Sequence, residues 1–197
     1  MSRPPPRGRT VMRTVFAFEV VSLDGYHVDA AGTLDWFPAD PQLEEYSRGQ
    51  GEHIDTIVMG RRTFELMASY WPTPAGAADD PVVAAFMNGL PKVVASRTLS
   101  EHEWGPTTFV ADDVAGHVAR LKAGPGRDIA VFGSSTLAGH LLAAGVIDEL
   151  RVAVAPVVLG AGTPLFAGAP GPIPLECVGA REMGASTFLT YRPASKT

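Results

Sequence analysis

The sequence predicts an α/β protein with one mostly parallel central sheet and an antiparallel hairpin at its C-terminal edge. Strand-forming runs alternate with helix-forming segments through the middle of the chain, which is typical of parallel sheets. Two longer β-forming runs close the chain around a turn at Gly184-Ala185, and this pattern is typical of a hairpin. No repeat or linker divides the 197 residues, so we expect a single domain over residues 13–194.

Composition narrows the functional classes. The net charge of −5 argues against a nucleic-acid partner, which would need a basic surface. No uninterrupted apolar run approaches the roughly 20 residues of a membrane helix, so we expect a cytoplasmic protein without a membrane partner. Cys177 is the only cysteine and the five histidines are scattered, so neither a disulfide nor a metal site is expected. Residues 1–12, rich in Arg and Pro, are expected to form a disordered leader, and the excess of Arg over Lys indicates a GC-rich bacterial source.

The first half of the chain begins with a β-rich run over residues 13–21, which Glu19 interrupts. A carboxylate on a central strand needs a partner or the edge of a pocket. A turn at 22–26 follows, and Asp40-Pro41 has the pattern of a helix N-cap and first helical position. The next elements are expected in the order strand 55–59, helix 60–70, loop 73–80, helix 82–88 and strand 92–95.

The second half continues the alternation. Its elements are expected in the order strand 107–110, helix 113–121, strand 129–132, a helix closed by Ala144-Gly145, and strand 150–158. Residues 160–174 form a long loop rich in Gly and Pro, and loops of this length are often functional. The hairpin strands are expected at 175–183 and 187–192.

The most informative stretch is 131–142, where an apolar strand ends in Gly133 and Ser134-Ser135-Thr136 opens a helix. The first N–H groups of a helix have no partner inside it, and with the helix dipole they attract an anion. Gly133 carries no side chain that would hold a phosphate away. We interpret the stretch as a diphosphate site, and the alternative is an ordinary strand-to-helix turn capped by Ser134 or Ser135.

Three expected strands end in residues suited to binding anions. These ends are Gly60-Arg61-Arg62-Thr63, Ser96-Arg97 and Gly133-Ser134-Ser135-Thr136. In open α/β sheets, ligands bind beyond the carboxyl ends of the strands. We therefore expect the three turns to meet along one sheet edge and to bind a phosphorylated dinucleotide together.

These motifs resemble those of a known superfamily. Residues 58–65 look like the cofactor-binding motif of dihydrofolate reductases, and residues 92–97 and 131–142 look like their other two cofactor segments. Ser22-Leu23-Asp24-Gly25-Tyr26 is typical of a sister group, the reductase domain of riboflavin biosynthesis and its small bacterial relatives, and so are residues 145–150 and 155–166. The resemblance implies a three-layer dihydrofolate reductase-like fold with NADPH as cofactor, and it is compatible with a homodimer.

The resemblance also implies cofactor contacts residue by residue. Arg61 or Arg62 provides the guanidinium that a 2′-phosphate needs, and Thr63 adds a hydroxyl. Ser96 and Arg97 lie along the adenosine portion. Further contacts come from Val20, Gly60 and Gly133. The diphosphate is held by backbone N–H groups of Ser134, Ser135, Thr136 and Leu137.

Two residues are candidates for the catalytic acid. The stretch before Asp40 resembles the approach to the acidic residue that supports protonation in dihydrofolate reductases, whereas counting back from Gly60 favours Glu44. Asp40 also suits a helix N-cap. Ala153 stands where that family has a folate-contacting Thr, and Ser134 replaces one of its paired glycines, so dihydrofolate is not the expected substrate.

The sequence is thus identified as a member of the riboflavin-type reductase group. The expected activity is NADPH-dependent reduction of a small heterocycle of pterin or pyrimidine type. The alternatives are a non-catalytic nucleotide-binding protein on the same scaffold and a true dihydrofolate reductase.

Overall fold

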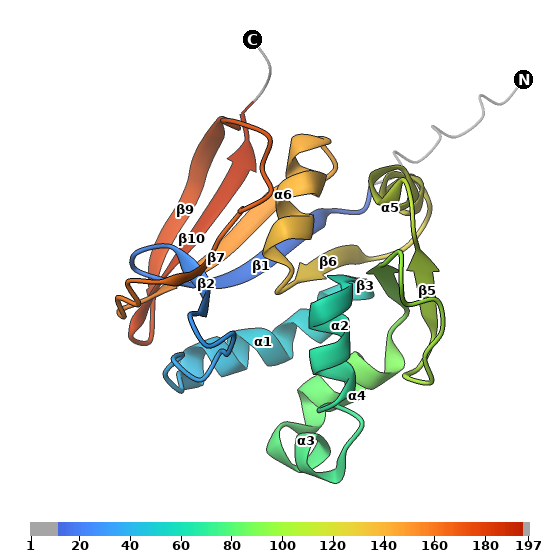
Figure 1. Ribbon diagram of the computed structural model, residues 1–197, viewed down its shortest axis with the longest axis horizontal. Helices are drawn as coiled ribbons and strands as arrows, with labels where there is room; N and C mark the ends of the chain where they lie inside the picture. The colour runs from blue at the N-terminus through green and yellow to red at the C-terminus, as the bar shows by residue number, and fades with distance from the viewer. Residues whose placement is uncertain (1–11, 195–197) are drawn as a thin grey trace, which may run out of the picture.

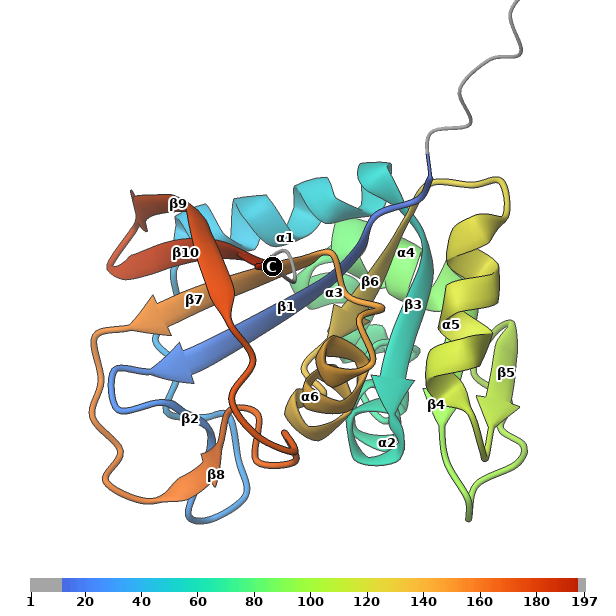
Figure 2. The same ribbon diagram turned by 90° about the horizontal axis from the view of Figure 1, so that it is seen from above.

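Eight strands form one sheet in the computed structural model, which describes residues 12–194 (Figures 1 and 2). The leader expected over residues 1–12 lies outside the described residues except for Met12. The strands are β1 (Val15–Ser22), β3 (Ile54–Gly60), β4 (Lys92–Ala95), β5 (Thr107–Val110), β6 (Asp128–Phe132), β7 (Glu149–Ala155), β9 (Leu175–Met183) and β10 (Ser186–Pro193). Their order across the sheet is β5-β4-β3-β6-β1-β7-β10-β9.

The strands from β5 to β7 all run parallel, with β1 between β6 and β7. β10 pairs antiparallel with β7, and β9 pairs antiparallel with β10, so the expected hairpin lies at the edge of the sheet. The predicted fold class is confirmed. Because β4, β3, β6 and β1 are parallel neighbours, their carboxyl ends share one sheet edge.

Helices cover both faces of the sheet. α5 (Val114–Ala123) and α6 (Ser135–Ala143) lie on one face, and α1 (Pro41–His53), α2 (Arg61–Ala68), α3 (Pro74–Asp79) and α4 (Pro81–Gly89) lie on the other (Figure 1). Within the part of the chain that the structure describes, no helix is both long enough and apolar enough to cross a bilayer.

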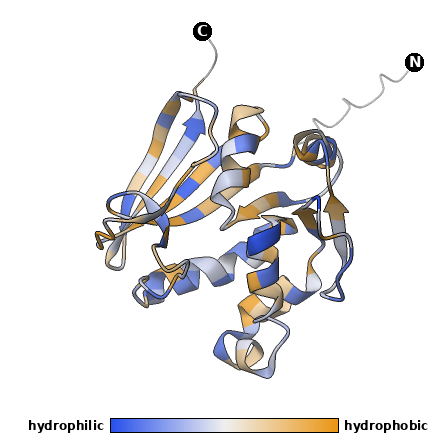
Figure 3. Ribbon diagram, viewed as in Figure 1, coloured by the Kyte–Doolittle hydropathy of each residue, from blue (hydrophilic) through white to orange (hydrophobic). Residues whose placement is uncertain are grey.

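The core follows the alternation of side chains along each strand, and apolar residues concentrate on the strands (Figure 3). Val15 and Ala17 belong to the apolar cluster on the α5–α6 face. Phe16 belongs to the cluster formed with α2 and α4 on the opposite face, and Phe18 packs against that cluster. By the same alternation Glu19 falls on the α5–α6 face, where it is buried.

Three local predictions were wrong. The expected loop at 73–80 contains α3, which Pro74 begins and the Thr73 hydroxyl caps by accepting the Gly76 N–H at 3.1 Å. The long loop at 160–174 contains β8 (Gly162–Pro164), which pairs with the equally unexpected β2 (Tyr26–Asp29) in a separate small sheet. β7 ends at Ala155 and does not extend to residue 158, since Pro156 follows it and cannot donate to a ladder.

Asp24 joins the turn after β1 to the loop after β7. Its carboxylate accepts the Ser22 hydroxyl at 2.7 Å and the N–H groups of Leu159 and Gly160 at 3.1 and 2.7 Å. The Ser22 hydroxyl and these N–H groups lower the pKa of Asp24 to about 2. The Ser-Leu-Asp-Gly motif therefore connects the loop after β1 to the loop after β7 by hydrogen bonds, at the carboxyl ends of these strands.

Candidate functional site

The first turns of α2 and α6 are joined at the sheet edge. The Ser134 hydroxyl accepts the Gly60 N–H at 2.9 Å and lies 3.0 Å from the Thr63 hydroxyl. Thr63 donates in turn to the Gly133 carbonyl at 2.8 Å. The turns after β3 and β6 are thus brought together as expected, and a ligand bound there would meet both helix starts.

These two helix starts differ from the other four. Side chains of Asp40, Thr73, Asp80 and Asp113 cap α1, α3, α4 and α5, whereas neither α2 nor α6 has a side-chain cap. The Ser134 hydroxyl points back to Gly60 and to the Phe132 carbonyl, so the alternative of a cap by Ser134 is wrong. Backbone N–H groups at both helix starts are left to bind an anion.

Gly133 has the conformation that this arrangement needs. Its φ of 52° lies in the left-handed region, which costs a residue with a side chain about 1–2 kcal/mol. A Cβ atom at this position would lie 3.5 Å from the Thr63 side chain, on the side that faces α2. The glycine therefore lets the chain turn sharply from β6 into α6 and keeps the space between the two helices open.

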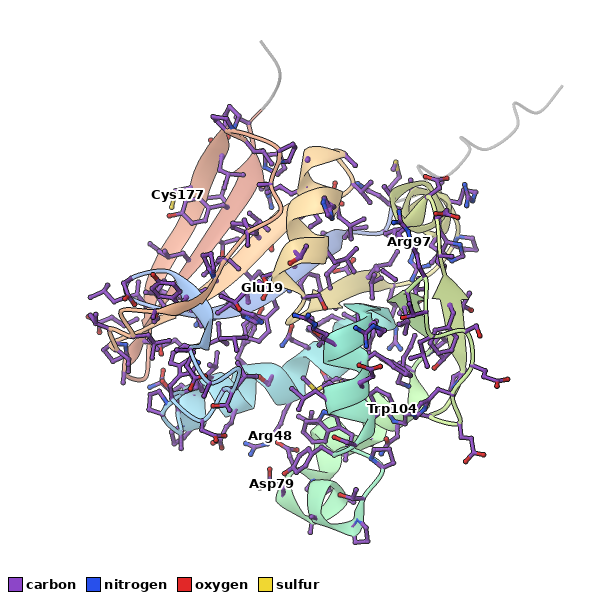
Figure 4. The ribbon with its side chains drawn as sticks, in the orientation of Figure 1. Glu19, Arg48, Asp79, Arg97, Trp104 and Cys177 are labelled. Atoms are coloured by element: carbon purple, nitrogen blue, oxygen red, sulfur yellow. The ribbon has the colours of Figure 1, made fainter. Side chains whose placement is uncertain are left out.

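The other predicted cofactor residues lie around this edge. Arg61 makes contacts of 3.0 and 2.9 Å with the Glu65 carboxylate one helical turn on, and Arg62 is exposed. Ser96 accepts two N–H groups of its own turn, and the exposed Arg97 is 3.7 Å from Asp112 (Figure 4). The Thr63 hydroxyl, expected to bind phosphate, donates to Gly133 instead.

A cleft of about 450 Å³ opens beside the joined helix starts, between the sheet, α1, α2 and α4. Val20, His27 and Gly133 form its wall at the sheet edge. Most of its remaining wall is apolar, with contributions from Phe18, Phe37, Leu43, Met67, Trp71, Val83, Phe86 and Met87. Charged residues of α1 and of the α3–α4 junction stand at the opposite end; among them, Figure 4 labels Arg48 and Asp79.

The two candidate acids occupy very different positions in the cleft wall. Asp40 is buried, and its two oxygens accept the N–H groups of Gln42 and Leu43 at the start of α1 and of Ala185 in the β9–β10 turn. Glu44 is exposed one turn later and lies 3.5 Å from Arg48. The geometry gives Asp40 the capping role and leaves Glu44 at the solvent side.

Glu19 and His27 form a buried pair at the same edge. One Glu19 oxygen lies 3.3 Å from Nδ1 of His27, and the two side chains are almost inaccessible to solvent. Burial raises the pKa of Glu19 to about 8, and the Ser134 backbone N–H opposes the rise. Burial lowers the pKa of His27, against the effect of the Val20 and Gly133 carbonyls. The partner that the sequence required for Glu19 is thus a histidine from β2.

Sequence reasoning missed His27. A single histidine after an Asp-Gly turn has no second catalytic or ligand residue at a characteristic spacing, and its neighbours in the chain do not predict that β2 is a strand. The unpaired carboxylate on β1 was the one available sign that a polar partner stood nearby.

The pair predicts an unusual dependence of stability on pH. Above pH 6.5 the unfolded chain has lost the proton of its histidine, whereas the folded pair keeps one proton until about pH 8. The free energy of unfolding should therefore fall by about 1 kcal/mol as the pH rises from 6.5 to 8. Between 4.5 and 6.5 the raised pKa of Glu19 and the lowered pKa of His27 act in opposite directions and largely cancel.

Urea unfolding of the wild type and of Glu19→Gln at pH 6.5 and 8 measures this effect. The variant has no acid at this position, so its stability should change little between the two pH values. Equal slopes in the two proteins would contradict the assignment of the proton to the pair. Asp24, whose pKa is lowered to about 2, titrates outside this window. Lys92, whose pKa is lowered to about 8, titrates at its upper end in both proteins and opposes the fall, so the difference between the two proteins isolates the pair.

Comparison with known proteins agrees with this geometry. The uncharacterized protein YyaP of Bacillus subtilis (strain 168) is 32% identical over 163 residues, which is 82% of this chain and 84% of that protein. A diaminohydroxyphosphoribosylaminopyrimidine deaminase/5-amino-6-(5-phosphoribosylamino)uracil reductase of Thermotoga maritima superimposes with a TM-score of 0.68 at 14% identity, over 93% of this chain and 57% of that one.

The fold also matches dihydrofolate reductase from Enterococcus faecalis, solved as a complex with NADP(H) and RAB-propyl. The TM-score is 0.59 at 18% identity, over 91% of this chain and 96% of that one. At such identities the two structures establish the fold alone. The family model of the RibD C-terminal domain matches residues 13–189, from just before β1 to within β10. The chain therefore belongs to the RibD C-terminal domain family.

Proposed function

We propose that this protein is an NADPH-dependent reductase of a small heterocycle of pterin or pyrimidine type, related to the riboflavin pathway. The observation that carries the proposal is the pair of uncapped helix starts, α2 and α6, joined through Ser134 beside an apolar cleft. Family membership supports it, and so do the neighbours, one of which is a uracil-derivative reductase and one of which was solved with NADP(H).

The residues present suit a phosphorylated dinucleotide. The N–H groups of Ser135, Thr136 and Leu137, at the uncapped start of α6, would hold a diphosphate. Arg61 and Arg62 open α2 on the same edge, where a guanidinium would pair with a 2′-phosphate. The bound cofactor would supply hydride, and the chain would align the reacting groups and exclude water.

The cleft suits one small ring system. Its volume of about 450 Å³ lies in the lower part of the usual range for ligand pockets, which is about 300–1,000 Å³. Aromatic and thioether side chains from Trp71, Phe86 and Met67 offer flat contacts to a heterocycle. Arg48 at the far end offers a cation to a polar substituent.

Fluorescence titration tests the cofactor assignment. NADPH should saturate the wild-type protein in the micromolar range, and NADH should bind more weakly. Replacing both Arg61 and Arg62 with alanine should raise the Kd for NADPH by about 10- to 100-fold, because a charge-assisted hydrogen bond contributes about 1.5–3 kcal/mol. The Kd for NADH should stay within about threefold, since NADH lacks the 2′-phosphate that these side chains would contact.

Arg120→Ala is the matched control, because this exposed arginine lies on α5, on the other face of the sheet, and pairs there with Asp113. It should leave both dissociation constants unchanged. Failure of the wild type to saturate with NADPH would overturn the proposed function. An unchanged preference for NADPH in the double variant would overturn the role of the two arginines.

A further inference from the structure

The imidazole of His27 bridges a gap in the sheet. β1 and β6 pair as far as Phe18 and Phe132, and beyond these residues the described ladder ends. His27 lies across the gap, with Nδ1 3.3 Å from the Val20 carbonyl and Nε2 3.1 Å from the Gly133 carbonyl. It also forms part of the cleft wall. The ring thus connects the α5–α6 face, where Glu19 is buried, with the cleft on the opposite face.

The contacts of this ring require an extra proton. Its two nitrogens face two carbonyl oxygens and one carboxyl oxygen, which is three acceptors and no obligatory donor. A neutral imidazole has a single N–H. These contacts fit a protonated ring beside a Glu19 carboxylate, or a protonated Glu19 beside a neutral ring whose Nε2–H donates to Gly133. Both arrangements hold the same number of protons, and both place an N–H at Nε2 beside the cleft.

We propose that His27 is the acid that protonates the substrate during reduction, and that Glu19 is a positioning residue that keeps the proton on the pair. The proposal rests on the function proposed above. The Gly133 carbonyl is too weak a base to take the proton, so the proton stays available for a stronger base that enters the cleft.

The step balances as follows. The carbon of a substrate C=N or C=O bond gains a C–H bond from the hydride supplied by NADPH, and the π electron pair moves to the nitrogen or oxygen. That atom takes the proton from Nε2 of His27. The substrate is reduced by two electrons and the cofactor is oxidised to NADP⁺. The pair is left with an ionised Glu19 beside a neutral imidazole, and it regains a proton from solvent through the cleft.

The other ionisable groups of the cleft are poorly placed for this role. Asp40 is occupied by three N–H groups, and Asp80 caps α4 and pairs with Arg48 at 2.8 Å. Asp79 accepts the Tyr70 hydroxyl, and Glu44 is exposed. Among the described residues, Glu19 is the one ionisable group within ion-pair distance of His27.

Nitrogen NMR of the ligand-free protein tests the proton on the pair without reference to activity. In the wild type the ring signals of His27, assigned by comparison with His27→Asn, should shift near pH 8, where the Glu19–His27 pair loses its one proton. In Glu19→Gln no carboxylate supports the imidazolium, so the midpoint should move below the ordinary histidine value of about 6.5. A wild-type pair that shows no loss of a proton above about pH 6.5 would overturn the proposal whatever the enzyme assays show.

Turnover tests the transfer itself, with 5-amino-6-(5-phosphoribosylamino)uracil as the probe at saturating NADPH. His27→Asn should lower kcat by about 100- to 1,000-fold, the usual contribution of a general acid, while the Kd for NADPH stays within about threefold. Added imidazole should restore part of the activity of His27→Ala. The alkaline limb of the kcat profile should lie near pH 8 in the wild type and move to lower pH in Glu19→Gln. His140→Asn, a change of an exposed histidine on α6, is the control and should behave as the wild type.

The outcomes separate the two proposals. A wild type that binds no NADPH removes both. A wild type that binds NADPH and reduces the probe, with His27→Asn within about threefold of it, removes the role of His27 and leaves the reductase function standing. A loss in His27→Asn that is independent of pH and not restored by imidazole marks His27 as a structural bridge and also overturns the proposal. If NADPH binds and the probe is not reduced, the pH at which the Glu19–His27 pair loses its proton in the NMR titration decides whether the proposal stands.

Discussion

Asp40→Ala is expected to lower the free energy of unfolding by about 2 kcal/mol, and this loss separates its structural role from a catalytic one. Alanine removes the N-cap of α1, which costs about 0.5–2 kcal/mol. It also removes the acceptor of the Ala185 N–H, and the loss of this part-buried hydrogen bond costs about 0.5–1.5 kcal/mol more. Urea unfolding at pH 6.5 measures the sum.

Asp40→Asn is the matched control. Its amide oxygen can accept the N–H groups of Gln42 and Leu43, but its NH₂ group cannot accept from Ala185. We expect an intermediate loss of about 1 kcal/mol, with reductase activity largely retained. The opposite pattern would assign Asp40 to catalysis: full stability in Asp40→Ala, together with loss of turnover in both variants.

Gly162→Ala is expected to destabilise the protein by about 4 kcal/mol, the largest effect of any single methyl group that we predict. A Cβ atom on Gly162 would lie 2.0 Å from the Val28 carbonyl oxygen, and φ is +149°. Because the obstacle is backbone, relief requires β8 to separate from β2. Because β2 carries His27, the variant should also lose turnover and should no longer be stabilised against unfolding by NADPH.

Gly160→Ala, two residues earlier in the same loop, provides the comparison. Its φ is also positive, at +72°, but an added Cβ would meet nothing within 4 Å. It should therefore cost only the left-handed conformation, about 1 kcal/mol. Thermal and urea unfolding of both variants measure the difference, and equal losses would show that the β2–β8 contact contributes little.

The arrangement of the sheet could be predicted from local patterns. Strand and helix alternate with clear chemical boundaries, such as Asp40-Pro41 before α1 and Asp113 before α5, and each of these boundaries is a side-chain cap in the structure. The elements that sequence reasoning missed are short. α3 has six residues and β8 has three, and lengths of this kind leave too few residues for a period to show.

The site could be predicted only in part. Glycine and small residues after β3 and β6 identified the right edge, because helix starts have local requirements. The role of Ser134 could not be found in this way, since its hydroxyl serves the backbone of Gly60 in place of its own helix. His27 could not be predicted either, because its partners lie on β1 (Glu19 and Val20) and in the turn after β6 (Gly133), and only the tertiary fold sets these distances.

The hydrogen bond from Gly60 to Ser134 spans 74 positions of the chain. The proposed phosphate site is not formed until β3 and β6 are both in the sheet, so a fragment that carries either turn alone should keep a helix start and have no nucleotide affinity. If the proposed function holds, nucleotide binding reports complete folding of this chain, and a bound dinucleotide should stabilise every strand between the two turns.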